Sequence, residues 1–161
     1  MNIFWLDTNF KKSAQYHCDK HVVKMIIEYA QILSVANREF GLDEGYNVTH
    51  RNHPCMMWAR ESQANWLALK IMALQLNKEY EYRYGRTHKS AYVIASLSMP
   101  PIPNIGITKV PQCVPEQYKC DNPIIAYRNY YIGEKAYFAR WKGRPVPEWF
   151  NYNGILLPNN S

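Results

Sequence analysis

The sequence predicts a mainly α protein, a compact helical bundle with long irregular proline-rich connections and a short extended segment at its N-terminus. Two long stretches lack Gly and Pro and repeat their apolar residues at helical spacing. Hydrophobic residues make up 47% of the 161 residues, which suffices for one contiguous core. Five of the ten prolines fall between residues 99 and 115, where they exclude a regular helix. We expect one domain spanning residues 1–161.

The N-terminal part is expected to begin as a buried strand or extended segment and to continue as one long helix. Residues 3–6 form a short apolar run that Asp7-Thr8-Asn9 closes. From about Lys11 to Arg38 the apolar residues keep helical spacing, and Gly41 ends the pattern. The sequence therefore predicts a helix over residues 11–38.

Two more helices are expected. After a loop over residues 41–52, Pro54 suits the first turn of a helix that runs to Tyr84 and stops at Gly85. This helix is apolar nearly all round, which indicates a central position in the core. A last helix is expected from Asp121, a good N-cap, to about Ile132, with a further helical turn over residues 134–141. The tail from residue 145 is expected to pack back as irregular chain.

The composition favours an anionic partner and a reducing compartment. The formal net charge is +6 with a pI near 9.1, which is typical of proteins that bind nucleic acid or another polyanion. No apolar run reaches the roughly 18 residues of a membrane span, so we expect a cytoplasmic protein that binds no membrane. The four cysteines lack paired CxxC spacing and are expected to be free thiols. Pairing of Cys113 with Cys120 across their short loop is the alternative.

A narrow polar line on the first predicted helix is the best candidate for a site. Residues placed at 100° intervals bring two histidines, two lysines, a glutamate and a glutamine onto one strip about three turns long. They are His17, Lys20, His21, Lys24, Glu28 and Gln31. If the strip borders a cleft, His21, His17 or Glu28 suits proton transfer and Lys24 suits amine chemistry. The alternative is a solvated face on which Lys24 and Glu28 form an ordinary (i, i+4) pair.

The histidines allow a metal site as a second hypothesis. His17 and His21 lie four residues apart, and His50 and His53 precede the second predicted helix, so the set could supply three ligands to zinc or another divalent ion. The glutamate of an HExxH motif is absent, and the favoured expectation is that the protein uses no metal or other cofactor. Alternatively, Arg51 with the amides at this helix start binds phosphate, or His53 or Asn52 simply caps the helix.

Basic and aromatic residues cluster in two further segments. Arg and Lys can contact phosphates, and Tyr or Trp can stack on unstacked bases, although tyrosines at helical spacing more often pack in the core. The candidates for nucleic-acid binding are Lys20, Arg51, His53, Arg83, Arg86, Lys89, Arg128, Arg140, Lys142 and Arg144.

Several segments together resemble the pyrimidine-dimer DNA glycosylases of the endonuclease V type. These are the short apolar start, the first helix with its ionisable residues, Gly45-Tyr46 followed by His53-Pro54, the long second helix, and the aromatic stretch Tyr130 to Tyr137. The segments HCDKHVVKM and NHPCMMW are also similar to uncharacterised phage proteins, which would place the chain in the host cytoplasm.

The resemblance implies an all-helical enzyme that flips a nucleotide out of duplex DNA and cleaves its glycosidic bond with an amine nucleophile and a helix-borne glutamate. Glu28 is the available glutamate. The family uses the amine of a small residue exposed by loss of the initiator methionine, whereas Asn2 should leave Met1 in place, so the amine of Met1 or Lys24 would have to serve. The leading hypothesis is a DNA base-excision glycosylase and abasic-site lyase. The alternatives are a histidine-ligated metal-dependent hydrolase and a non-catalytic nucleic-acid-binding module.

Overall fold

The computed structural model describes residues 1–159 and confirms a mainly α fold, with no strand in that range. Its helices are α1 (Phe10–Tyr16), α2 (Asp19–Glu39), α3 (Pro54–Ala59), α4 (Gln63–Tyr84), α5 (Lys89–Ser96) and α6 (Pro123–Tyr130). A 3-10 turn, η1 (Glu116–Tyr118), precedes α6, and a π turn, η2 (Tyr131–Lys135), follows it. No helix within the described range is long and apolar enough to cross a membrane.

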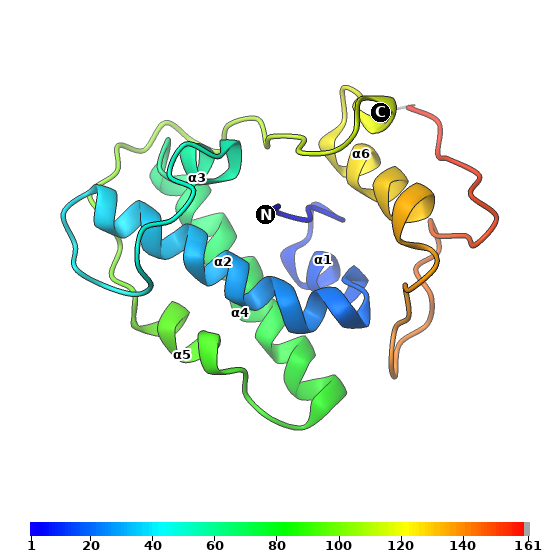
Figure 1. Cartoon of the computed structure of the whole chain (residues 1–161), viewed down its shortest axis with the longest axis horizontal. Coiled ribbons are helices and arrows are strands. Elements are labelled where there is room, and N and C mark those ends of the chain that lie inside the picture. The colour runs from blue at the N-terminus through cyan, green and yellow to red at the C-terminus, as the bar shows by residue number, and fades with distance from the viewer. Residues whose placement is uncertain (160–161) are drawn as a thin grey trace.

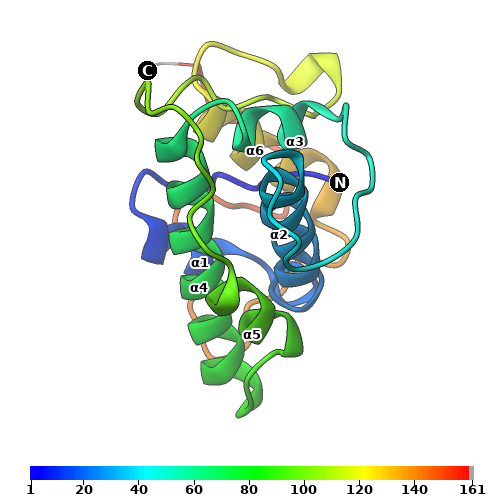
Figure 2. The ribbon, with the colours of Figure 1, turned by 90° about the vertical axis from the view of Figure 1, so that its left-hand side faces the viewer.

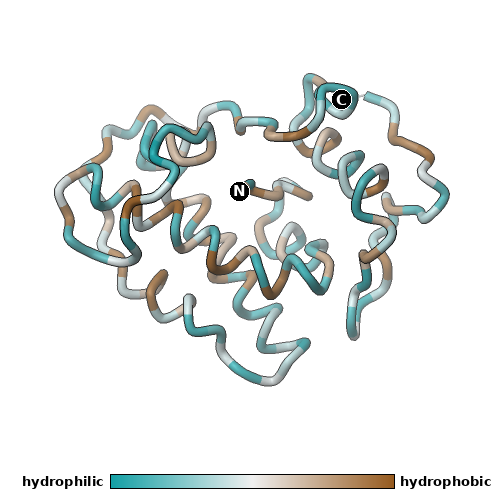
Figure 3. Tube along the Cα trace, viewed as in Figure 1, coloured by the Kyte–Doolittle hydropathy of each residue, from teal (hydrophilic) through white to brown (hydrophobic). Residues whose placement is uncertain are grey.

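The two long helices form the centre of the bundle. Helices α2 and α4 pack against each other (Figures 1 and 2). Helix α1 contacts α4, α3 contacts α2, and α5 contacts both α2 and α4. Hydrophobic and hydrophilic positions alternate along the helices in Figure 3. The buried hydrophobic side chains pack together in one core cluster. The N-terminal segment, residues 1–6, runs as extended chain between α2 and α6 (Figure 1) and buries Ile3, Phe4, Trp5 and Leu6 in that core.

The prediction of one continuous helix over residues 11–38 is wrong at one point. The chain is extended at His17 (ψ 128°) and Cys18 (ψ 163°), which separates α1 from α2. Distant parts of the chain supply hydrogen bonds to this break: the Asp19 N–H donates to the Arg140 carbonyl at 2.8 Å, and Trp141 Nε1 donates to the Tyr16 carbonyl at 2.8 Å. Tertiary hydrogen bonds therefore replace helical ones where the sequence has no helix-breaking residue.

The second predicted helix is also divided. Helix α3 ends at Ala59, and α4 begins after Ser62, whose backbone is extended. The side chain of Asn65 donates to the Trp58 carbonyl at 2.9 Å and so satisfies the end of α3. The expected ends are confirmed, with Pro54 in the first turn of α3 and Gly85 in the left-handed region (φ 70°) after α4.

The C-terminal helix differs from its prediction at both ends. The N-cap is Asn122 instead of Asp121, and its side chain accepts from the Ile124 N–H at 3.0 Å. Gly133 does not end the helix, since η2 continues through it. A Cβ atom at Gly133 would lie 2.1 Å from the Tyr118 hydroxyl, so glycine is needed here for close packing. Beyond η2 only a turn follows, and Trp141 lies in irregular chain, so the expected helical turn does not reach residue 141.

Candidate active site

A polar cavity of about 190 Å³ lies where the N-terminal segment meets α2, η2 and the proline-rich crossing segment. Three residues of the predicted polar line, His21, Lys24 and Glu28, line it from α2. The other lining residues are Met1, Asn2, Phe4, Met25, Cys113, Tyr130 and Lys135. The helical spacing thus correctly placed three ionisable side chains on one cavity wall.

The amino group of Met1 faces the carboxylate of Glu28 across this cavity. Its nitrogen lies 3.7 Å from Glu28 Oε1, and both side chains are largely buried, at 7% and 16% exposure. An amine beside a carboxylate in a small enclosed space is an arrangement suited to proton exchange between the two groups.

The side chain of Asn2 fixes the start of the chain. Asn2 Nδ2 donates to the Cys113 carbonyl at 2.8 Å, and its Oδ1 accepts from the Tyr127 hydroxyl at 2.7 Å and from the Ile3 N–H at 2.9 Å. Asn2 is only 8% exposed. All of its polar side-chain atoms are therefore used to hold the residue that carries the amine in place.

Two hydroxyl groups hold the next residues of the segment. The Phe4 N–H donates to the Tyr29 hydroxyl at 3.0 Å, and the Leu6 N–H donates to Ser13 Oγ at 3.1 Å. Ser13 Oγ in turn donates to the Phe4 carbonyl at 3.2 Å. Side chains of α1 and α2 thus satisfy the backbone polar groups of an extended segment that has no neighbouring strand. The packing of these helices therefore fixes the position of the amine.

His21 is a neutral hydrogen-bonding group. Its ring is 6% exposed, stacks on Phe4 at 4.3 Å and has Nδ1 2.6 Å from the Tyr131 hydroxyl. Burial, followed by the positive charges of His17, Lys135 and Lys24, lowers the pKa of His21 to about 2. We assign the proton to Nε2 because the Tyr131 hydroxyl can donate to Nδ1. His21 therefore offers the cavity a neutral donor and carries no charge at physiological pH.

His17 lies away from the cavity, inside the core. Its Nδ1 is 2.7 Å from the Ser13 carbonyl, which can only accept, so Nδ1 carries the proton. Its Nε2 accepts from the Tyr29 hydroxyl at 2.8 Å. Burial lowers the pKa of His17 to about 4. With no exposed surface and both nitrogens bonded, this residue supports the N-terminal segment through Tyr29 and is not placed to act on a ligand, contrary to its place in the predicted polar line.

These two buried histidines predict acid destabilisation. Their pKa values are about 4 and about 2 in the folded chain against about 6.5 when unfolded, so the unfolded chain binds protons that the folded chain does not. Stability is therefore complete above about pH 6.5 and falls as the pH falls. His17 alone accounts for about 3 kcal/mol of this loss by pH 4. The urea midpoint measured across this range checks it. His17→Gln, which keeps a donor and an acceptor, should show a shallower pH dependence, and parallel profiles would refute the assignment.

Lysines lie at the cavity and at the surface hollow next to it. Lys24 is exposed on α2, and Lys135 reaches the cavity from η2 with its Nζ 4.7 Å from the centre of the Tyr130 ring. Lys20 lies one turn before Lys24 and borders an adjacent surface hollow together with it. Lys142 lies over the ring of Tyr84, which lines the same hollow. These four lysines are called here the lysine rim. Lys24 and Lys135 line the cavity, whereas Lys20 and Lys142 lie at the adjacent hollow.

Three arginines expected to bind nucleic acid hold the fold together instead. Arg83 has a fully buried side chain and bonds to Glu79 at 3.0 Å and Asp19 at 2.9 Å. Arg144 pairs with Glu79 at 2.9 Å, and Arg128 pairs with Asp7 at 2.9 Å and donates to the Leu6 carbonyl. Because these arginines are paired with carboxylates, we no longer interpret them as part of a nucleic-acid-binding surface.

The remaining basic candidates are dispersed. Arg51 is exposed but paired with Glu39 at 2.8 Å, and His53 caps α3 by accepting from the Cys55 N–H at 3.1 Å, as the capping alternative predicted. Arg86 and Lys89 lie at the far end of α4 and the start of α5, and Arg140 lies over the Tyr152 ring. Gln31, the end of the predicted polar line, borders a different hollow, together with Arg86 and Lys89.

The four histidines of the metal hypothesis do not converge. His17 is enclosed by its hydrogen bonds, and His50 is exposed and contacts Thr49. Within residues 1–159, the one group of at least three His, Cys, Asp or Glu with ligand atoms close together is His53, Cys55 and Cys113. The sulfur nearest Cys113 is that of Cys55, at 3.7 Å, while Cys120 Sγ donates to the Asn122 carbonyl. All four cysteines are free thiols.

Sequence reasoning missed several lining residues that come from distant segments. Asn2 is a polar residue at the edge of an apolar run, a signal that could have marked it. Tyr130 and Lys135 fall in the aromatic stretch Tyr130 to Tyr137 but were not among the candidate site residues. Cys113 gave no signal, because its place depends on the path of the proline-rich crossing segment.

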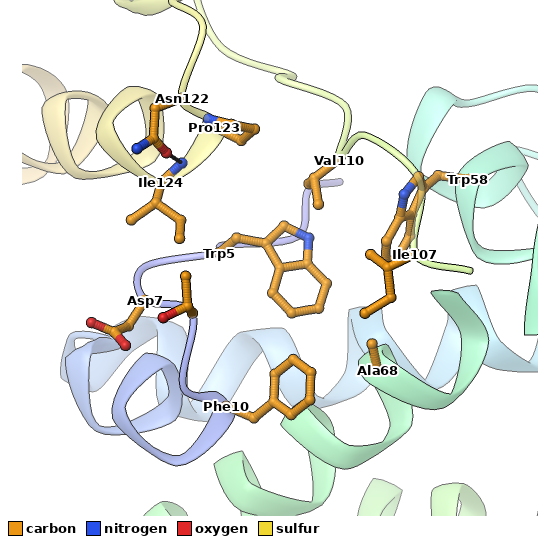
Figure 4. A pocket seen from close by; sticks show the side chains of 11 residues that line it. Trp5, Asp7, Phe10, Trp58, Ala68, Ile107, Val110, Asn122, Pro123 and Ile124 are labelled. Atoms are coloured by element: carbon orange, nitrogen blue, oxygen red, sulfur yellow. Dashed lines mark hydrogen bonds between the residues drawn. The ribbon is translucent and has the colours of Figure 1, made fainter. Parts of the chain in front are cut away.

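A second cavity, of about 310 Å³, lies on the other side of the N-terminal segment and is almost entirely apolar (Figure 4). Trp5, Phe10 and Trp58 form its aromatic walls, and Ile124 closes one side. Its acidic residue, Asp7, is paired with Arg128. This cavity can hold an apolar group but offers little for acid–base chemistry.

The family described as pyrimidine dimer DNA glycosylase matches residues 1–92, more than half of the chain. The matched part contains Met1, His21, Lys24 and Glu28. No curated protein and no solved structure was found to match the chain.

Proposed function

We propose a specific base-excision reaction for this chain, because the chain belongs to the pyrimidine dimer DNA glycosylase family. The proposed substrate is duplex DNA that carries a pyrimidine dimer. The proposed reaction cleaves a glycosidic bond of the dimer and then cuts the strand at the abasic site. The positioned pair of Met1 amine and Glu28 carboxylate, 3.7 Å apart in a polar cavity, is the observation that supports this reaction.

The Met1 amine is the proposed nucleophile. In model peptides α-amino groups titrate near pH 8 and lysine amines near pH 10.4, so an α-amine is more often unprotonated at neutral pH. Glu28 can accept the ammonium proton and release the nitrogen lone pair. Lys24 is exposed at the cavity mouth, where its charge suits phosphate binding.

In the proposed reaction the Met1 nitrogen attacks C1′ of the damaged nucleotide, and the bond from C1′ to the base breaks with its electron pair on the base. Glu28 takes a proton from the attached amine and passes it to O4′ as the bond between C1′ and O4′ breaks, which opens the sugar ring and gives a protonated imine between Met1 and C1′. Glu28 then takes a proton from C2′, a double bond forms between C2′ and C3′, and the 3′ phosphate leaves. Water hydrolyses the imine and frees the amine.

The surroundings of the pair suit a flipped nucleotide. Neutral His21 lines the cavity, and so do the aromatic residues Phe4 and Tyr130, whose rings are stacked with centroids 6.3 Å apart. The lysine rim lies beside the opening, where it can neutralise the phosphates on either side of an extruded nucleotide. Because His21 is neutral over the physiological range, we expect no activity change between about pH 5.5 and 7.5 that depends on His21.

Borohydride trapping tests the proposed nucleophile. Reduction of the imine on duplex DNA with a pyrimidine dimer or an abasic site should give a covalent adduct, and proteolysis with mass spectrometry should place it on the N-terminal peptide. An intact mass measured first establishes that the amine is free. Lys24→Arg, which keeps the charge, should still be trapped, whereas selective reductive dimethylation of the α-amine should abolish the adduct.

The outcomes separate the alternatives. An adduct on Lys24 would overturn the assignment of Met1 as the nucleophile. Absence of both an adduct and strand cleavage, with DNA binding that weakens steeply with salt, would favour a non-catalytic module and reject the proposed function.

A further inference from the structure

Three side chains with metal-ligating atoms meet beside the polar cavity. His53 and Cys55 lie at the start of α3, and Cys113 lies on the proline-rich crossing segment, 58 residues from Cys55 along the chain. Their ligand atoms all lie within 4.8 Å of one another, and the two sulfur atoms are 3.7 Å apart. Cys55 is buried and the other two residues are partly buried, so the group is shielded from bulk water yet reachable.

The spacing matches a tetrahedral thiolate site. Zinc–sulfur bonds are about 2.3 Å long, and a tetrahedral angle between two such bonds puts the sulfur atoms about 3.8 Å apart. The two cysteines therefore need almost no rearrangement to share one ion. An imidazole nitrogen of His53 lies within 4.8 Å of both sulfur atoms and would have to move closer to them to share the ion.

We propose that His53, Cys55 and Cys113 bind a thiophilic divalent metal ion such as Zn²⁺, with water in the fourth position. On binding, the two thiols release their protons to solvent and each thiolate donates an electron pair to the ion. Neutral His53 has one nitrogen lone pair, which Nδ1 now uses to accept the Cys55 N–H, so coordination replaces this cap hydrogen bond.

The consequence of this site concerns the N-terminal segment. The Cys113 carbonyl accepts from Asn2 Nδ2, and the Cys113 N–H donates to the Tyr127 hydroxyl that also bonds Asn2. A metal ion joining Cys113 to α3 would fix the part of the proline-rich crossing segment that holds Asn2. We therefore expect metal binding to raise the melting temperature of the protein, whether or not the proposed base-excision function holds.

Cobalt binding to the full, reduced and metal-free chain tests the site. One equivalent of Co²⁺ should give the visible bands of a tetrahedral ion and the near-ultraviolet charge-transfer absorption of bound thiolate, and Zn²⁺ should displace it. Cys55→Ser and Cys113→Ser should weaken cobalt binding by more than the roughly 10- to 100-fold typical of losing an outer-shell partner. Cys120→Ser is the matched control, because Cys120 bonds the Asn122 carbonyl and lies outside the group.

Alkylation of the unaltered protein keeps the test independent of variant folding. Compared with the metal-free protein, bound Zn²⁺ should slow the reaction of the partly exposed Cys113 with a thiol reagent and leave the reaction of Cys120 unchanged. A cobalt spectrum without thiolate absorption would overturn the proposal. So would equal cobalt affinity in folded Cys120→Ser, Cys55→Ser and Cys113→Ser, or a disulfide between Cys55 and Cys113 that persists under reducing conditions.

Discussion

Glu28→Gln is expected to lower the single-turnover rate of strand cleavage at a pyrimidine dimer by about 10²- to 10⁴-fold. The amide is nearly the same shape as the carboxylate but can neither take the proton of the Met1 ammonium, 3.7 Å away, nor remove one from the sugar. Removal of a negative charge beside the lysine rim should leave duplex binding intact or slightly tighter. Strand cleavage on a labelled duplex and fluorescence anisotropy with the same duplex measure the two effects separately.

Glu39→Gln is the matched control for this experiment. Glu39 lies on the same helix and is also paired with a cation, Arg51 at 2.8 Å, but it lies outside the cavity. It should cleave at the rate of the unaltered protein. A Glu28→Gln protein that binds and cleaves like the control would remove Glu28 from the reaction, and a loss of binding equal to the loss of rate would make it a binding residue.

The part of the site carried by α2 could be predicted from sequence because it depends on one periodicity. His21, Lys24 and Glu28 fall on one helical face whatever the rest of the chain does. His17 was wrongly added to this face, because the rule of 100° per residue holds only inside one helix. The break at His17 and Cys18 is held by Arg140 and Trp141, more than a hundred residues away, and no local residue signals it.

The residues on the opposite wall of the cavity could not be predicted from the sequence, because their positions depend on tertiary structure. Cys113 reaches the cavity through the path of the proline-rich segment. Lys135 reaches it through η2, which continues past Gly133, and Tyr118 packs closely against that glycine. Composition marked the C-terminal arginines as a nucleic-acid surface, since charge is visible in a sequence. Their carboxylate partners are not visible in it. The helix ends at Pro54 and Gly85 were predicted more accurately, because these residues act through backbone geometry alone.

Arg83→Met should have the largest effect on stability, a loss of about 3 to 5 kcal/mol in the free energy of unfolding. The guanidinium is fully buried and bonds Glu79, Asp19 and the carbonyls of Gln15 and His17, all at 2.9 to 3.0 Å. Removing it leaves Glu79, at 3% exposure, with Arg144 as its one remaining ion-pair partner among the described residues. Urea denaturation at neutral pH measures the loss.

The size of this effect distinguishes a buried charge network from a surface basic residue. Arg86→Met, three positions along the chain and exposed, should change the free energy of unfolding by no more than about 0.5 kcal/mol. Adding Glu79→Gln to Arg83→Met should restore part of the stability, because most of the cost lies in leaving a buried carboxylate undercompensated.

Since Arg83 also bonds the His17 carbonyl at the α1–α2 break, the Arg83→Met variant should slow trapping at Met1. Unchanged stability would instead mean that the other hydrogen bonds at the break, with Arg140, Trp141 and Tyr131, suffice to hold it.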